Sequence, residues 1–159
     1  MNDSVKPEWM RKKQAEQEAA VRAEDLRQQR VVAAALLINR DGQKFWKELK
    51  EKLAIAVEFL PDLRLAGSIS PTSDDAIRIL ANKPGVLASQ TYTDLSYNRE
   101  AKEIRCGTLN RGIYSLRFCV ITGENRVAVI SSLRPGVMGP EAAAQHVMEK
   151  MIDCIESQS

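Results

Sequence analysis

Histidine, cysteine and aromatic residues are scarce in this chain of 159 residues, and each scarcity excludes some kinds of site. The three cysteines, Cys106, Cys119 and Cys154, include no closely spaced pair, so the sequence predicts neither a disulfide framework nor a zinc site. The single histidine, His146, has no second metal ligand at a usable spacing, and we expect it on the surface of a helix. We therefore expect buried, reduced thiols, no bound metal and no histidine-based catalysis.

Long apolar runs are missing as well. The longest, from Val31 to Ile38, has eight residues, whereas a helix needs about 20 apolar residues to cross a bilayer. The basic residues near the start, Lys6 and 11–13, lead into Gln and Glu rather than into an apolar stretch, so we expect no signal peptide. Together with the unpaired cysteines, these features indicate a cytoplasmic protein that does not insert into membranes.

Charge of one sign is not in excess. The formal net charge is +2; residues 1–60 carry 12 basic and 10 acidic residues, and residues 61–159 carry 11 of each. Interleaved charges of this kind are typical of a solvated surface rather than of a strongly basic nucleic-acid-binding protein.

Catalytic and cofactor motifs are also absent. Gly107, Gly112 and Gly123 fit neither the P-loop spacing nor the dinucleotide-binding spacing. The neighbouring acids Asp74 and Asp75 lie where a turn or a helix cap would use them. The sequence therefore predicts no cofactor and no enzymatic activity.

Helix breakers are nearly absent from the first 60 residues, which are rich in Ala, Glu, Gln, Lys, Arg and Leu. Between Pro7 and Pro61 there is one glycine, Gly42, and no proline. Because these residue types have the highest helix propensity, we predict a long N-terminal helical region, in which residues 1–40 form a charged extension. We expect an interruption at residues 39–42, where the glycine would close one helix or an aspartate would cap the next.

Residues 41–159 are predicted to form a single α+β domain of the order helix, antiparallel sheet, helix. Apolar residues recur at steps of three and four over residues 43–60 and 140–157, so each segment has one apolar face that packs on the sheet. Aromatics make up only 5% of the sequence, so the core is mainly aliphatic. The first stripe consists of Trp46, Leu49, Leu53, Ala56, Val57 and Leu60, and the second of Ala144, Val147, Met148, Met151, Ile152 and Ile155.

Short alternating segments separated by Asn- and Gly-rich turns lie between the two helices and predict an antiparallel meander of about four to six strands. They cover residues 91–97, 104–108, 114–120 and 126–133. Residues 63–69 fit a first strand or an extended entry. Residues 76–81 fit either a capped short helix or a strand, and the strand is favoured because the run is short and ends at Lys83-Pro84-Gly85.

Placing each turn at its Asn/Gly cluster gives a predicted register in which the two faces of the sheet differ. Leu95 is expected opposite Ile104. The face that packs on the helices is expected to carry Leu116, Phe118, Val120, Ala128 and Ile130. The opposite face is expected to carry Asp94, Arg105, Arg117 and Ser131, together with an apolar patch of Cys119, Ile121, Val127 and Val129. A slip of one residue would exchange the faces.

These patterns favour a non-enzymatic protein–protein interaction or assembly module with a projecting or self-associating N-terminal helix. Ala19, Ala23, Leu26, Ala33 and Leu37 follow heptad-like spacing, although Arg30 occupies one position of the seam. The exposed patch on the sheet is a second place where another subunit or partner can lie. The predicted association surface consists of Leu26, Leu37, Ile121, Val127 and Val129.

A weak nucleic-acid-binding protein is the alternative. An open antiparallel sheet can bind single strands through stacking and phosphate contacts, and the expected Arg row and the basic N-terminal segment would supply the cations. The residues predicted to contact an anion or nucleic acid are Arg105, Arg117, Arg111, Lys12 and Lys13.

Overall fold

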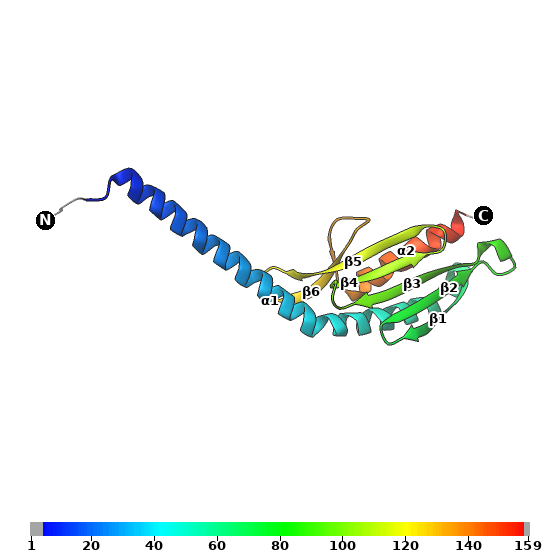
Figure 1. Ribbon diagram of the computed structural model, residues 1–159. Helices are drawn as coiled ribbons and strands as arrows, with labels where there is room; N and C mark the ends of the chain where they lie inside the picture. The colour runs from blue at the N-terminus through cyan, green and yellow to red at the C-terminus, as the bar shows by residue number, and fades with distance from the viewer. Residues whose placement is uncertain (1–4, 158–159) are drawn as a thin grey trace. The chain divides into compact units, whose positions relative to one another are not determined.

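A computed structural model describes residues 5–157 and shows an α+β chain. Helix α1 (Glu8–Glu58) is followed by a short 3-10 helix, η1 (Leu60–Leu63), a seven-stranded antiparallel sheet and helix α2 (Pro140–Glu156) (Figure 1). The chain divides into two compact units, one up to Leu36 and one from Leu37 onward. This architecture confirms the predicted fold class.

Helix α1 does not break at residues 39–42, so the predicted interruption is wrong. Gly42 lies inside the helix and is buried, and a Cβ atom built on it would lie 2.9 Å from the hydroxyl oxygen of Tyr97. The glycine is therefore explained by close packing against a core tyrosine and not by helix termination. A glycine inside a helix interior costs about 1 kcal/mol relative to alanine, and the surrounding strong helix formers tolerate that cost.

The sheet is an open meander in which every strand pairs with the next one along the chain. Residues 76–81 belong to β2, as favoured by the sequence, and the two-residue strand β7 adds one strand to the expected number. At the turn between β5 and β6, Gly123 and Asn125 adopt positive φ angles of 84° and 48°, as these residue types permit. The strands are β1 (Ala66–Ser73), β2 (Ala76–Asn82), β3 (Thr91–Asn98), β4 (Glu103–Thr108), β5 (Gly112–Ile121), β6 (Arg126–Ser131) and β7 (Val137–Met138).

One face of the sheet packs against α2 and the C-terminal part of α1, and the predicted stripes of both helices are buried there except for Ala56 and Ile152, which are partly buried. Trp46 stacks on Tyr97 with ring centroids 6.0 Å apart, and Phe118 lies edge-on to both Tyr97 and Phe45. The indole N–H of Trp46 also donates to the backbone carbonyl of Asp74, 3.1 Å away, which ties the β1–β2 turn to the helix. These aromatic contacts join the C-terminal part of α1 to β3 and β5.

The observed register corrects the prediction for β6. Phe118 pairs with Val129 and Val120 with Val127, so both valines lie on the helix-covered face, whereas Ala128 and Ile130 lie on the other. The loop between Ile121 and Arg126 sets this register, which differs by one residue from the prediction and therefore reverses every side chain of the strand. Leu95 pairs with Cys106 rather than with Ile104, a two-residue difference that leaves its face unchanged.

Candidate association surface

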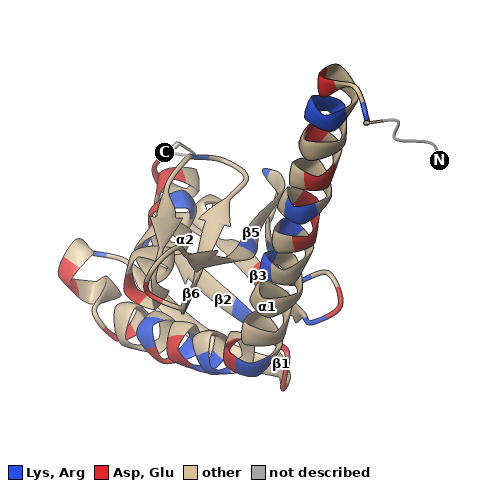
Figure 2. Cartoon of the chain, turned by 90° about the vertical axis from the view of Figure 1, so that its left-hand side faces the viewer, with Lys and Arg blue, Asp and Glu red and all other residues tan. Residues whose placement is uncertain are grey.

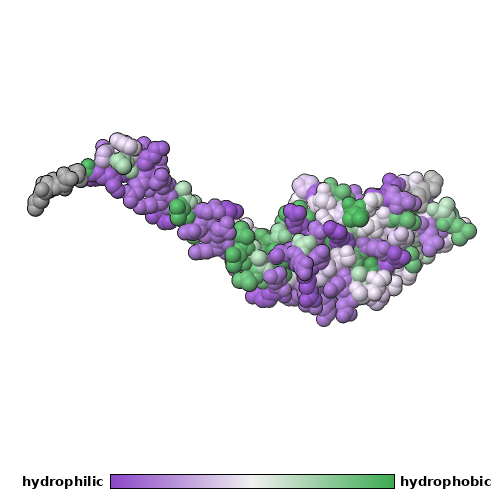
Figure 3. Space-filling model, viewed as in Figure 1, coloured by the Kyte–Doolittle hydropathy of each residue, from purple (hydrophilic) through white to green (hydrophobic). Residues whose placement is uncertain are grey.

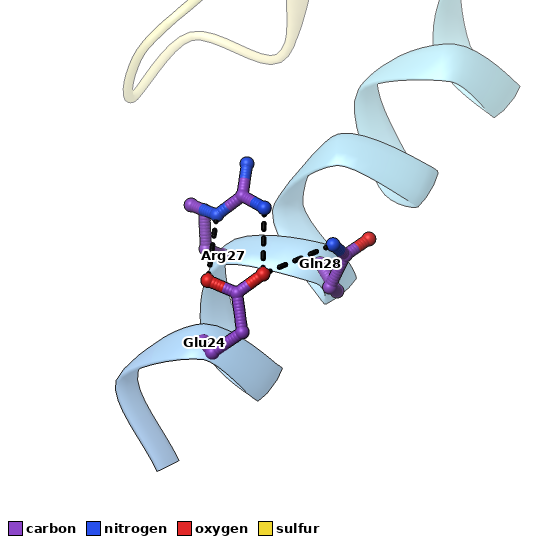
Figure 4. Close-up of polar contacts among 3 residues, drawn as sticks. All are labelled: Glu24, Arg27 and Gln28. Atoms are coloured by element: carbon purple, nitrogen blue, oxygen red, sulfur yellow. Dashed lines mark hydrogen bonds and ion pairs between the residues drawn. The ribbon is translucent and has the colours of Figure 1, made fainter. Parts of the chain in front are cut away.

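The helical segment of residues 8–36 is stabilised locally by propensity and by side-chain pairs along its surface. Basic and acidic residues are interleaved along α1 (Figure 2). Arg27 donates to Glu24 from both Nε (3.0 Å) and Nη2 (2.6 Å), and Gln28 donates to the same carboxylate at 3.1 Å (Figure 4). The Arg27 and Gln28 hydrogen bonds lower the pKa of Glu24. Such solvated pairs support a helix but contribute little free energy, so they do not explain why this segment is long.

A ring of exposed apolar side chains lies toward the end of this segment. Val31, Val32 and Leu36 are 52%, 56% and 65% exposed, and Leu26, little more than one turn before them, is 53% exposed. Hydrophobic patches interrupt the largely hydrophilic surface of the helical segment (Figure 3). We call Leu26, Val31, Val32 and Leu36 the apolar collar. Helix positions that are apolar on several sides are typical of a helix that another structure covers.

The predicted association residues do not form one surface. Leu26 is exposed and belongs to the collar, whereas Leu37 is half-buried and packs against the core. Ile121 is half-buried at the end of β5. Val127 and Val129 are 7% and 0% exposed and belong to the core, so placing them on an exposed patch was wrong, for the register reason given above. The sequence signal that points to the collar is the apolar run from Val31 to Ile38.

The open face of the sheet carries arginines, but carboxylates accompany them. Arg78 forms a bidentate pair with Asp94 at 2.6 and 2.8 Å, and its guanidinium lies 4.2 Å from the centre of the Tyr92 ring. Arg105 pairs with Glu103 at 3.2 Å. Arg117 lies opposite the same Glu103 in the β4–β5 register. This face is therefore a mixed-charge surface and not a continuous cationic row.

The five residues predicted to contact an anion are divided among several places. Arg105 and Arg117 share the open face of the sheet, and Arg111, in the β4–β5 turn, donates to the hydroxyl of Ser157. Lys12 and Lys13 are exposed near the start of α1 and belong to the other unit. Ser131, expected in the Arg row, lies instead on the helix-covered face.

His146 is a buried residue and not the expected surface histidine. It is 2% exposed, its Nε2 atom lies 2.9 Å from the Ser131 hydroxyl, and its ring meets that of Tyr114 edge-on at 5.5 Å. The Ser131 hydroxyl also accepts the backbone N–H of Leu133 at 3.1 Å. The misplaced register of β6 concealed this pair, because it put Ser131 on the opposite face.

The burial of His146 makes the stability of the fold sensitive to pH. Burial and the nearby cations of Arg134 and Lys150 lower its pKa, and Glu149 opposes them. Because the folded pKa lies below the unfolded value of about 6.5, the unfolded chain binds the proton more tightly. The neutral, buried His146 therefore contributes its full stabilisation above about pH 6.5, and this contribution is lost as the pH falls toward the pKa of the folded state.

We expect the free energy of unfolding to fall more steeply between pH 7 and pH 5 in the native sequence than in His146→Gln, by up to about 1.4 kcal/mol per pH unit. Glutamine keeps a polar partner for Ser131 but does not titrate. Urea unfolding of both proteins at several pH values measures this difference. Parallel pH curves would contradict it.

The cysteines show no sign of a reactive or metal-binding arrangement. Burial raises the pKa of the Cys106 thiol to about 12, and burial together with the neighbouring Cys106 raises the pKa of Tyr114, so both groups are neutral near pH 7. Burial also raises the pKa of Cys119. Within residues 5–157 no group of three or more His, Cys, Asp or Glu side chains is arranged to hold a metal ion.

Comparisons with protein-family models, with curated proteins and with solved structures find no match to this chain. In the part of the chain that the structure describes, no helix has an apolar stretch that is long enough to cross a bilayer.

Proposed function

We propose that this protein is a non-enzymatic assembly module, and that its helical segment of residues 8–36 associates with the same segment of a second copy. The observation that carries this proposal is the exposure of the apolar collar. Its four large aliphatic side chains are each more than half exposed in a segment whose other positions are mostly polar or alanine.

Energetics favour a covered collar over a solvated one. Burying a fully exposed Val or Leu side chain is worth about 1.5–3 kcal/mol, and the four collar side chains are a little over half exposed, so covering the whole collar contributes about 3–6 kcal/mol per chain. The ion pairs along the segment contribute little, and in proteins most of the stability of a helix comes from packing of its apolar face. Association through the collar therefore stabilises the helix and the assembly together.

A second copy fits this surface because the segment is nearly neutral in charge and its charges are interleaved along the helix. Glu24 and Arg27 already pair within one chain, so two such helices meet without a large excess of like charge. The seam expected from the sequence is thin, since Ala19, Ala23 and Ala33 contribute small side chains and Arg30 interrupts it. The collar supplies the larger apolar contacts.

The test is a pair of matched variants of the full chain. We expect Val32→Glu with Leu36→Glu to weaken self-association by about 100-fold or more, because charged groups cannot be buried unpaired in such a contact. Helicity measured by circular dichroism should fall with it. The control places the same two charges at exposed polar positions of the same segment, Gln17→Glu with Gln29→Glu, and should associate like the native protein. Equal association of both variants and the native chain would overturn the proposal.

The observed charges give less support to the nucleic-acid alternative. Asp94 pairs with Arg78, Glu103 accompanies Arg105 and lies opposite Arg117, and Arg111 already donates to Ser157. Binding of nucleic acid depends on several unpaired cations that neutralise phosphates, which makes its affinity fall steeply with salt.

A further inference from the structure

A groove lined largely by apolar side chains lies between α2 on one side and the end of α1 with the following 3-10 helix η1 on the other. Its volume is about 530 Å³. Ile55, Phe59 and Leu63 line it and are 50%, 59% and 60% exposed. Met148 and Ile152 of α2 complete its wall. Three large hydrophobic side chains half exposed around one hollow are typical of a surface that binds a partner.

The charged side chains around the groove are mostly acidic. Asp62, Glu141 and Glu149 line it, with Lys52 as the one base among the lining residues that the structure describes. Gln145 donates a hydrogen bond to Glu149 at 2.7 Å, which holds that carboxylate at the rim of the groove. An occupant with an apolar anchor and adjacent cations is therefore complementary to this groove.

The start of this same chain has those properties. Trp9 is 66% exposed and Met10 is 43% exposed, both in the first turn of α1. Residues 5–14 carry four basic residues and one acidic residue. Tryptophan is enriched among the side chains that dominate binding energy, and the exposed Trp9 lies two residues before the basic run Arg11, Lys12 and Lys13, which joins an anchor to the required charge.

We infer that the groove between α1 and α2 binds the N-terminal turn of a second copy of this chain, with Trp9 inserted beside Phe59 and the basic residues facing the acidic rim. This inference rests on the proposed self-association and adds to it a second contact at a separate surface. It gives a role to the basic N-terminal residues in which their charge recognises carboxylates and not phosphates.

Two variants of the full chain test the contact. Trp9→Ala removes the anchor, and Phe59→Glu places a fourth carboxylate in the groove; both sites are exposed, so neither change disturbs the core. We expect each variant alone to self-associate about tenfold more weakly than the native chain. An equimolar mixture of the two should recover part of the loss, because one chain then supplies an intact groove and the other an intact Trp9. Leu87→Glu, at a side chain that is 95% exposed, serves as the control and should associate normally.

Tryptophan fluorescence gives a second readout. The emission of Trp9, taken as the difference between the native chain and Trp9→Ala, should shift to shorter wavelength as concentration rises, and this shift should be absent in Phe59→Glu. Native-like association of both variants, or a mixture that recovers nothing, would overturn the groove contact. If the collar variant still loses association in that case, the proposed function stands without this inference. A native chain that never associates would overturn both.

Discussion

Replacing Trp46 with alanine should destabilise the folded unit by about 3–5 kcal/mol, the usual cost of removing a large aromatic side chain from a core. The side chain is 1% exposed, stacks on Tyr97 and holds the β1–β2 turn through its hydrogen bond to the carbonyl of Asp74. Domains are stable by about 5–15 kcal/mol, so the loss is a large fraction of the total. Urea or thermal unfolding followed by circular dichroism measures it.

A graded pair of variants separates the two contributions of Trp46. Trp46→Phe keeps an aromatic ring against Tyr97 but loses the hydrogen bond to Asp74, and we expect an intermediate loss. Leu87→Ala, at the exposed side chain used above, should leave the free energy of unfolding within about 0.5 kcal/mol of the native value. If Trp46→Ala unfolded at the same denaturant concentration as this control, Trp46 would not lie in a core between α1 and the sheet.

Among the Gly→Ala substitutions in this chain, Gly67→Ala should lower the free energy of unfolding the most. A Cβ atom there would lie 2.5 Å from the backbone oxygen of Leu80 and 2.6 Å from a methyl group of Leu60, and the backbone oxygen cannot move aside without disturbing the β1–β2 pairing. We expect a loss of about 2–3 kcal/mol, in the range of overpacked cores. Equilibrium unfolding of the purified variant measures the loss.

Gly107 provides the matched control for Gly67, because it also lies in a strand. A Cβ atom on Gly107 would meet only a side-chain carbon of Ile113, at an ordinary contact distance of 3.6 Å, and its φ angle is not positive. Alanine should be neutral or slightly stabilising at this position, since it restricts the unfolded chain. Equal losses at the two glycines would show that β1 does not lie against Leu60 as described.

The helices and strands that could be predicted from the sequence are those in which apolar residues recur with a clear period. The apolar stripes of the two helices and the alternation of β3, β4 and β5 were predicted from the sequence, because each of these elements buries one face. The continuity of α1 through Gly42 could not be predicted, since the reason for this glycine is Tyr97, more than 50 residues further along the chain. Local residue preference predicted a break in the helix at residues 39–42, but the packing of Gly42 against Tyr97 keeps the helix continuous.

The candidate surfaces were harder to predict, because each depends on register or on which side of a helix is covered. A one-residue difference at the β5–β6 turn moved Val127, Val129 and Ser131 to the core and concealed the partner of His146. The exposure of Val32 and Leu36 and the groove beside Phe59 depend on tertiary packing, which periodicity does not reveal.

The solution mass of the full chain, measured by light scattering after size exclusion over a wide range of concentration, tests the central claim of self-association most directly. The chain mass is 17.7 kDa. We predict a mass that rises with concentration to twice this value or to a higher multiple, and that stays at one chain for Val32→Glu with Leu36→Glu. A native protein that keeps the mass of a single chain at every concentration would contradict the account.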